Sequence, residues 1–301
     1  MDRSAGVLNA LTVDVEEYFQ VLAMAPYVPR ARWETSPSRL AWALERVLGL
    51  CAEVGVQGTF FTLGWVAERH PDLVRRIVAE GHEVASHGYG HQRVGDMTPR
   101  AFRRDVHYAR VLLEDIVGEA VIGYRAPAFS LGRHTPWAVP ILAETGHRYS
   151  SSVYPVRHDH YGDPDAPRWP YRSGEEQPLL EVPLTTLRLF GRNWPVAGGG
   201  YFRLLPYAAS RAALGRVNAT EGKPAVFYIH PWELDPGQPR IPGVGGRTRF
   251  RHYLNLHRTE NRLRRLLCEF RWGRMDQVFA RELARIPGPP GRAAAAAARA
   301  A

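Results

Sequence analysis

Two histidines four residues apart, His87 and His91, stand in the stretch SHGYGH together with Gly88 and Gly90. Each glycine costs about 1 kcal/mol relative to alanine inside a helix. The stretch therefore does not favour a helix on which the two histidines would share one face. The residues before the pair, EVAS, are typical of a strand, and we expect a strand that ends in a tight turn. Two imidazoles on one turn are candidate ligands of a metal ion.

Carboxylates that could join these histidines stand in VDVEEYF, at the end of the first apolar run. Asp14 and Glu16 lie on the same side of an extended strand, whereas Glu17 points the other way and is interpreted as a surface acid. Two imidazoles and one carboxylate are typical of a hydrolytic site for zinc or a similar divalent cation. Amide hydrolysis also needs a base for the water and an acid for the amine, and Asp14 and His230 have the chemistry for these roles.

The elements that must position these side chains follow one another as alternating strands and helices. This order predicts a parallel α/β sheet with crossover helices, either open or closed into a barrel. In such barrels the functional side chains collect at the carboxyl ends of the strands. The candidates Asp14, Glu16, His87, His91, Arg125 and His230 all stand where a strand-like run ends. These runs are VLNALTVDVE, GTFFTLG, EVASHG, VIGYRAP, RYSSSVYP, LLEVPLTTLRL and PAVFYIHP, and the helical patterns are SPSRLAWALERVLGLCAEVG, PDLVRRIVAEG, TPRAFRRDVHYARVLLEDIVG and TPWAVPILAETG.

Two further stretches differ from this alternation. Residues 157–178 are rich in proline, glycine and charge, which predicts a long surface loop. Between positions 247 and 274, Leu263, Leu266, Leu267 and Phe270 have helical spacing, with arginines on the other face. This pattern predicts either a terminal helix docked on the core or a surface for an anionic partner, such as a phospholipid or a pyrophosphate-linked sugar.

The bulk composition is that of a globular protein. Of the 301 residues, 45% are hydrophobic and 23% are charged. The net charge is +9, but Lys223 is the only lysine and most arginines are scattered over amphipathic helices, so we expect no nucleic-acid partner. No secretory signal and no run of about 18 apolar residues is visible. We therefore expect a cytoplasmic protein without a transmembrane segment, with peripheral membrane contact as an alternative.

Five motifs of the chain resemble those of a known family in type and order. TVDVEEYF, SHGYGH, YRAPAF, SSSVYP and YIHPWELDP are similar to the motifs of the NodB-homology polysaccharide deacetylases, carbohydrate esterase family 4, from about Leu8 to Pro236. The stretches GWVAERHPDLVRRIVAEGHEVASHGYGH, VAGGGYFRLLPY and FRHYLNLHRTENRLRRLL resemble the subgroup associated with exosortase (PEP-CTERM) loci. The resemblance implies a distorted (β/α) barrel over residues 1–236, a C-terminal helical extension packed on it over 237–287, and a low-complexity tail over 288–301.

The resemblance also implies roles for individual residues. It implies one divalent metal ion, zinc above all, with Co2+, Ni2+ or Mn2+ as alternatives, and its ligands are expected to be Glu16, His87 and His91. It assigns Asp14 as the base, Arg125 as the arginine that pairs with it, and His230 as the general acid. Further residues are expected to contact the substrate, although Phe129 and Trp232 suit a place in the core equally well: Tyr124, Pro127, Phe129, Ser151 and Trp232.

One position departs from the pattern of the subgroup. An aspartate usually precedes the pair of serines in the fourth motif, and this chain has Ser150 there. A serine hydroxyl can hydrogen-bond to an imidazole, but it cannot stabilise an imidazolium by charge. Either another acid, such as Glu233 or Asp235, replaces it, or activity is reduced, or the acid is not needed here.

The activity expected from this resemblance is removal of N-acetyl groups from N-acetylhexosamine units. The substrate would be a polysaccharide or its lipid-linked oligosaccharide precursor, in exopolysaccharide biosynthesis. Two alternatives remain: an allantoinase-like hydrolase of a small cyclic amide, and a catalytically weakened, carbohydrate-binding member of the family.

Overall fold

The computed structural model describes residues 6–158, 161–176 and 178–286. Within these residues the main sheet has nine strands in the order β10-β1-β2-β3-β4-β5-β7-β6, with β11 also paired to β1. All pairs are parallel except β6 with β7. The strands are β1 (Leu8–Val15), β2 (Thr59–Thr62), β3 (Glu83–Ser86), β4 (Gly123–Tyr124), β5 (Tyr149–Ser150), β6 (Tyr171–Ser173), β7 (Leu179–Glu181), β10 (Val226–Ile229) and β11 (Arg271–Gly273), and a separate antiparallel hairpin is formed by β8 (Thr186–Leu189) and β9 (Arg192–Pro195).

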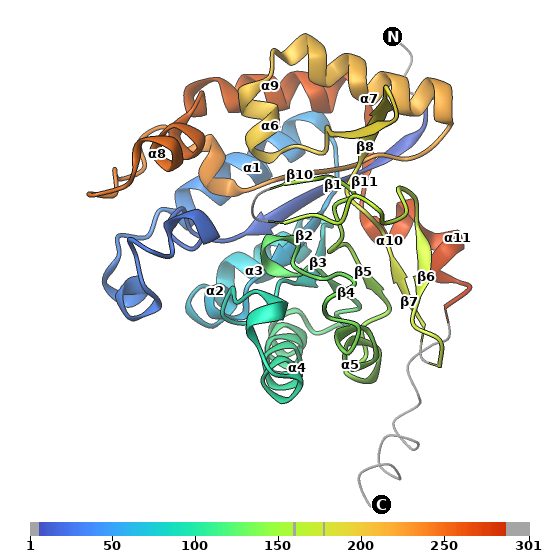
Figure 1. Ribbon diagram of the computed structural model, residues 1–301. Helices are drawn as coiled ribbons and strands as arrows, with labels where there is room; N and C mark the ends of the chain where they lie inside the picture. The colour runs from blue at the N-terminus through green and yellow to red at the C-terminus, as the bar shows by residue number, and fades with distance from the viewer. Residues whose placement is uncertain (1–5, 159–160, 177, 287–301) are drawn as a thin grey trace, which may run out of the picture.

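Helices lie on both sides of the strands. Figure 1 shows α2 to α5 on one side and α1, α6, α7 and α9 on the other. Among the described residues no helix is long and apolar enough to cross a membrane. The helices are α1 (Leu40–Val54), α2 (Gly64–Arg69), α3 (Pro71–Ala79), α4 (Pro99–Val117), α5 (Ala138–Glu144), α6 (Gly199–Leu204), α7 (Tyr207–Glu221), α8 (Gly246–Tyr253), α9 (Leu256–Glu269), α10 (Met275–Val278) and α11 (Ala280–Leu283).

The predicted α/β class with a parallel-strand sheet is confirmed. In the part of the chain that the structure describes, no strand ladder joins β7 to β10. Isolated backbone contacts connect this side instead: Val196 N donates to Thr185 O at 3.4 Å, and Tyr228 N donates to Ala197 O at 2.7 Å. Gly198 also forms a parallel bridge with Tyr228. Backbone contact therefore continues from the chain after β7 to β10 without the ladder of a regular barrel.

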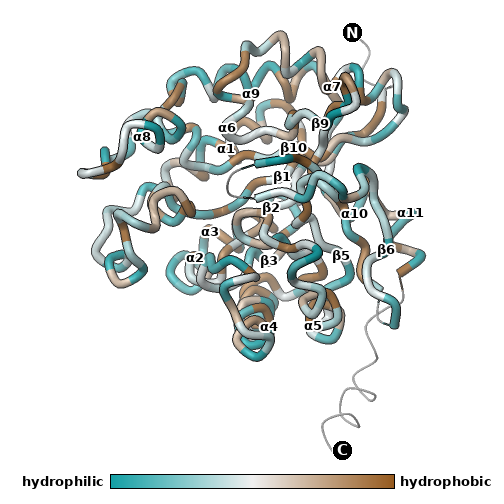
Figure 2. Tube along the Cα trace, viewed as in Figure 1, coloured by the Kyte–Doolittle hydropathy of each residue, from teal (hydrophilic) through white to brown (hydrophobic). Residues whose placement is uncertain are grey.

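The start of α4 follows from local sequence. Thr98 Oγ1 accepts a hydrogen bond from Ala101 N at 3.2 Å, and Pro99 is the first helical residue. Phe102, Val106, Ala109 and Leu113 form its buried face, and Figure 2 shows the mixed hydropathy along this helix. The helix begins and ends where the pattern predicted.

The start of α1 corrects the prediction for Glu17. This acid was expected at the surface, but it is only 1% exposed. Its carboxylate accepts hydrogen bonds from Ser38 Oγ, from Arg39 N at 3.1 Å and from Leu40 N at 3.3 Å. Glu17 therefore caps the amino terminus of α1, which begins at Leu40 rather than near Pro37. Strand alternation places a side chain on one face, but it does not reveal that a helix end covers that face.

The remaining segments partly follow the predictions. The stretch 157–178 contains strand β6, so it is not wholly a loop. In α9, Leu263, Leu266 and Leu267 are buried and Phe270 packs partly buried beside them, as expected of a docked helix. After α9 the chain adds β11 to the edge of β1. The tail 288–301 lies outside the described residues, and the domain division at residue 236 stays a prediction.

Candidate metal and catalytic site

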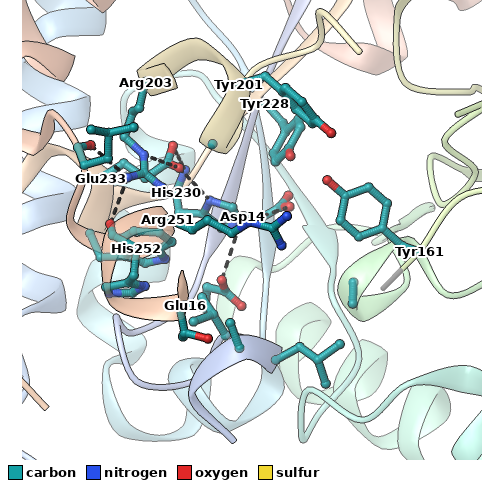
Figure 3. A pocket seen from close by; sticks show the side chains of 18 of the residues that line it. Asp14, Glu16, Tyr161, Tyr201, Arg203, Tyr228, His230, Glu233, Arg251 and His252 are labelled. Atoms are coloured by element: carbon teal, nitrogen blue, oxygen red, sulfur yellow. Dashed lines mark hydrogen bonds and ion pairs between the residues drawn. The ribbon is translucent and has the colours of Figure 1, made fainter. Parts of the chain in front are cut away.

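The carboxyl ends of neighbouring strands bring the candidate side chains together. Asp14 lies in β1 and Glu16 just after it, His87 follows β3, and His230 follows β10. These side chains line a pocket of about 370 Å³, in which Figure 3 labels Asp14, Glu16 and His230. Since β10, β1, β2 and β3 are consecutive in the sheet, their carboxyl ends meet at one edge, as parallel strands require.

Glu16, His87 and His91 form a donor set that fits a divalent cation. Their ligand atoms all lie within 4.8 Å of one another. Glu16 Oε2 lies 2.8 Å from His91 Nε2, yet this buried oxygen has no partner with hydrogen-bond geometry among the described residues. His87 Nδ1 lies 2.7 Å from the carbonyl oxygen of Arg125. Because a carbonyl can only accept, Nδ1 carries the proton and Nε2 keeps its lone pair, which is the usual arrangement of a metal-binding histidine.

The electrostatics of this set also suit a cation. Burial lowers the pKa of His87 to about 3, so its imidazole is neutral. Burial tends to raise the pKa of Glu16, but His91 and His230 outweigh it and hold the pKa below its usual value. Neutral imidazoles and an ionised carboxylate are the forms that zinc binds.

The turn that holds the two histidines is ordered by its backbone. Gly88 has φ +71°, and Asp105 accepts from Tyr89 N at 2.9 Å and from Gly90 N at 3.3 Å. A Cβ on Gly88 would lie 2.7 Å from the Asp105 carboxylate, and one on Gly90 would lie 1.8 Å from Nη1 of Arg30. The predicted strand and tight turn are confirmed, and the positive φ of Gly88 is a backbone conformation that glycine adopts without steric cost.

Arg125 and Asp14 form a fully buried ion pair. Arg125 Nη1 donates to Asp14 Oδ1 at 2.6 Å and to Thr12 Oγ1 at 2.8 Å. The same guanidinium donates to Ser151 O and Ser151 Oγ, both at 3.0 Å, and lies 4.0 Å from the ring centre of Phe61. Four hydrogen bonds fix the guanidinium, and it in turn fixes the orientation of the carboxylate.

His230 lies between carboxylates on two sides. Its Nε2 lies 3.4 Å from Glu16 Oε1 and 3.9 Å from Asp14 Oδ2, and its Nδ1 lies 3.6 Å from Glu233 Oε1. Burial lowers the pKa of His230, but Glu16, Glu233 and Asp14 outweigh burial and raise it to about 9. Glu233 accepts from Arg203 Nε at 3.1 Å; although burial acts to raise the Glu233 pKa, Arg203 and His230 keep it below its usual value.

The acids considered as replacements at position 150 differ in their contacts. Glu233 lies beside His230, whereas Asp235 accepts from Arg39 at 2.8 and 3.0 Å. Ser150 is fully buried, and its hydroxyl donates to Ser152 Oγ at 2.7 Å. Of these acids, Glu233 therefore has the position from which a carboxylate can act on His230.

The residues expected to contact substrate fall into two groups. Phe129 and Trp232 line the pocket, and Trp232 stacks between His230 and His252, with ring centres 5.2 and 4.3 Å away. The other three lie outside the described pocket lining: Tyr124, Pro127 and Ser151. Tyr124 and Ser151 are fully buried, and Ser151 contacts Arg125 rather than the pocket.

Several pocket residues were not among the candidates from sequence. They come from α6, α8, β10 and the chain between β5 and β6, and Figure 3 labels all of them except Arg247 near Asp14, Glu16 and His230. The stretches VAGGGYFRLLPY and FRHYLNLHRT were singled out as motifs without a role, and they supply most of these residues. The set is Tyr161, Tyr201, Arg203, Tyr228, Arg247, Arg251 and His252.

Two protein families match consecutive parts of the chain. Residues 38–150 match the family described as "Polysaccharide deacetylase", and residues 151–280 match the "Domain of unknown function (DUF3473)". A peptidoglycan deacetylase of Helicobacter pylori is 29% identical over 155 residues, 49% of this chain and 50% of that protein. A chitooligosaccharide deacetylase of Rhizobium leguminosarum bv. trifolii is 43% identical over 61 residues, 20% of this chain and 28% of that protein. The chain thus spans half or less of the length of these relatives.

Solved structures share the fold. A protein of Mycobacterium smegmatis described as a candidate polysaccharide deacetylase superposes with a TM-score of 0.63 at 21% identity, over 96% of both chains. Puue allantoinase superposes with a TM-score of 0.59 at 17% identity, over 93% of this chain and 91% of that one. At these identities the likeness concerns the fold alone. The family matches show that residues 38–150 are similar to polysaccharide deacetylases and that residues 151–280 are similar to the DUF3473 family.

Proposed function

We propose that the protein is a divalent-metal-dependent hydrolase that removes N-acetyl groups from N-acetylhexosamine units of a saccharide. The observation that carries the proposal is that one pocket holds a Glu–His–His donor set, an arginine-held carboxylate and a histidine that lies beside Glu16 and Glu233. These are the groups that amide hydrolysis requires: a cation site, a base and an acid. The names of the relatives, which act on peptidoglycan and chitooligosaccharides, support an N-acetylated saccharide as substrate.

Glu16, His87 and His91 would hold the metal ion, and their nitrogen and oxygen donors favour zinc. When bound, such an ion supplies Lewis-acid polarisation of the acetyl carbonyl and lowers the pKa of water. The carbonyl contact to His87 Nδ1 sets the tautomer in advance, so no proton has to move within that ring when the ion enters.

Asp14 is assigned as the base. Arg125 occupies its Oδ1 at 2.6 Å, so Oδ2 is the oxygen that faces His230 and the pocket. Oδ2 would accept the proton of the attacking water. The buried guanidinium orients the carboxylate for this transfer, because its hydrogen bonds leave little freedom for rotation.

His230 is assigned as the acid. Against the effect of burial, Glu16, Glu233 and Asp14 raise the pKa of His230 to about 9, which favours an imidazolium with a proton on Nε2, the atom nearest Glu16 and Asp14. This proton would pass to the departing nitrogen, releasing acetate and an amino sugar. Glu233 lies on the Nδ1 side, and its negative charge supports the imidazolium, the task that Ser150 cannot perform.

The finer assignment concerns the biological substrate. The resemblance of three stretches to the exosortase-associated subgroup supports exopolysaccharide biosynthesis and a polymer or lipid-linked precursor. The arginines of α8 that line the pocket, Arg247 and Arg251, suit a substrate with an anionic group.

The test is metal analysis of the purified protein followed by parallel assays. Acetate release from N-acetylglucosamine oligomers, dependent on a bound metal and abolished by a chelator, is the expected result. Ring opening of allantoin without acetate release from the oligomers would instead assign the pocket to a cyclic amide. Saccharide binding without acetate release under any of Zn2+, Co2+, Ni2+ or Mn2+ would assign a binding role and contradict the proposal.

A further inference from the structure

A second, larger groove adjoins the catalytic pocket. It encloses about 1580 Å³ between the segment Pro164–Tyr171 and the β8–β9 hairpin. Tyr201 and Leu204 of α6 line both this groove and the catalytic pocket, so the two spaces adjoin at that helix. A molecule longer than one sugar that reaches the catalytic pocket can therefore extend onto this surface.

Aromatic side chains supply flat surfaces along the groove. Trp169 and Tyr171 come from one wall, and Trp194, which is 51% exposed, comes from the hairpin. Trp194 is opposite Leu187 in the hairpin, and Leu187 belongs to a small apolar cluster that Trp169 also contacts. This packing holds the indole of Trp169, and Trp194 Nε1 donates to Leu189 O at 3.4 Å. Aromatic surfaces with polar neighbours are suited to the apolar faces and hydroxyl groups of sugar rings.

The charge of the groove selects among saccharides. Its described lining contains four arginines and one acid, Asp165. Arg168 pairs with Glu221 at 2.7 Å, and Asp165 pairs with Arg133 at 3.3 Å, so each of these has a structural partner. The exposed arginines of the hairpin, Arg188 and Arg192, thus give the groove a positive surface, and a guanidinium is suited to a carboxylate or phosphate group.

We infer that this groove binds an anionic oligosaccharide chain and extends the catalytic pocket toward the sugars that flank the reacting N-acetylhexosamine. The inference rests on the proposed function for the position of the reacting sugar, and it adds the substrate class. Charge and proximity to the pocket favour this occupant. A phospholipid surface is the rival occupant, because Phe190 at the hairpin tip is 96% exposed beside the same arginines. Phe190, however, does not line the groove, so the two occupants can be separated by substitution.

The probes are hyaluronan hexasaccharide, which alternates N-acetylglucosamine with glucuronate, and chitohexaose, which is its uncharged counterpart. Calorimetry on the full chain should give tighter binding of hyaluronan, by about tenfold, because its carboxylates can accept charged hydrogen bonds from the guanidinium groups. The double substitution Arg188→Gln with Arg192→Gln should remove this preference and leave chitohexaose affinity unchanged. Trp194→Ala should weaken both ligands, and Phe190→Ser, the control on the same hairpin, should weaken neither.

Equal affinity of the two hexasaccharides for the parent protein would overturn the inference, as would a preference that survives the double substitution. Loss of binding to phosphatidylglycerol vesicles in the double variant, with hyaluronan affinity unaltered, would also overturn it and assign the hairpin to a lipid surface. Because calorimetry needs no turnover, groove binding without acetate release contradicts only the proposed function. Acetate release that is independent of length and charge contradicts only the groove.

Discussion

The floor and the rim of the catalytic pocket are built in different ways. On the floor, Asp14, Glu16 and His87 stand at strand ends and are 1–2% exposed, and Arg125 beneath them is fully buried. On the rim, α6, α8 and the β8–β9 hairpin present half-exposed Leu204 and Phe250 together with arginines. The floor consists of groups whose contacts hold them in one geometry, whereas the rim offers surface to a ligand.

This difference separates the chemical step from substrate selection. The floor is built at the carboxyl ends of strands β1, β3, β4 and β10, and it contains the proposed catalytic groups Asp14, Arg125 and His230. The rim lies within residues 151–280, the part that matches DUF3473. Substitutions on the floor should therefore change kcat, and substitutions on the rim should change KM.

The largest effect is expected from removing a proposed metal ligand. His87→Ala should abolish stoichiometric metal binding and lower acetate release by more than about a hundredfold, since even the outer partners of metal ligands are worth 10–100-fold. Metal content by plasma mass spectrometry and an acetate assay measure both. His107→Ala, on the exposed face of α4, is the matched control and should match the parent protein. Full metal content in the His87 variant would contradict the ligand assignment.

The second-largest effect is expected at Asp14, and it distinguishes the proposed base from the proposed metal ligands. Asp14→Asn should retain the metal and lose about 10²–10⁴ in kcat, because the amide can accept no proton from water. Metal content and kcat measured on the same sample test this. A variant that hydrolyses at the parental rate would show that Asp14 is not the base.

A smaller effect is expected from Glu233, which acts through His230. Glu233→Gln should lower kcat by about tenfold, because the imidazolium loses one of its supporting charges. Activity requires protonated His230 and is lost as pH rises through its pKa. Since Glu233 raises that pKa, the alkaline limb of the kcat profile should move to lower pH in the variant.

Asp235→Asn is the matched control for Glu233, because Asp235 pairs with Arg39 and not with His230. Its pH profile should overlay that of the parent. If both variants, or neither, displace the alkaline limb, Glu233 has no specific role in holding the proton on His230.

Rim residues should affect binding more than turnover. Arg251→Gln should raise KM for an anionic N-acetylated oligosaccharide by about three- to tenfold with kcat unchanged, since a rim contact is made equally in the ground and transition states. Arg249→Gln, on the same helix but outside the described pocket lining, should leave KM unchanged. A fall in kcat without a change in KM would place Arg251 among the floor residues.

The smallest effect on activity is expected from Glu83, at the amino end of β3. Its substitution should change the stability of the protein rather than its activity. Burial, together with Asp276, raises the pKa of Glu83 from 4.5 to about 7. A raised carboxyl pKa contributes stability below pH 4.5 that is lost as pH rises toward 7, by at most about 3 kcal/mol. Glu83→Gln should remove this slope and be the more stable protein above pH 7.

Urea unfolding of the parent and the Glu83 variant between pH 4.5 and 8 measures the difference in their free energies of unfolding. Subtracting one pH curve from the other removes the opposite effect of buried histidines such as His82, which both proteins share. The pKa of His82 is lowered to about 4 by burial, so its contribution falls as pH decreases. Parallel stability curves would show that Glu83 ionises in the folded protein as easily as in the unfolded chain. Acetate release should be equal in the two proteins.

Sequence reasoning succeeded where a local pattern carries the structural information. The parallel α/β class followed from alternating runs, and the strand-and-turn form of SHGYGH followed from its glycines. The candidates Asp14, Glu16, His87, Arg125 and His230 were found because each ends an apolar run, and parallel strands bring such ends to one edge. The cap by Glu17 and the burial of Tyr124 and Ser151 were missed, because they depend on which distant segment covers a strand end.

What the sequence determined by itself is thus the set of reacting groups, since their types and their places at strand ends are local properties. The tertiary structure alone decided which acid lies beside His230, because Glu233 and Asp235 are equally plausible until distances separate them. It also decided that α6, α8 and the β8–β9 hairpin form the rim and its groove. Contacts between segments far apart in the chain depend on how the segments pack in the folded protein. Neither the hydrophobic periodicity nor a motif within one segment specifies which distant segment it will contact.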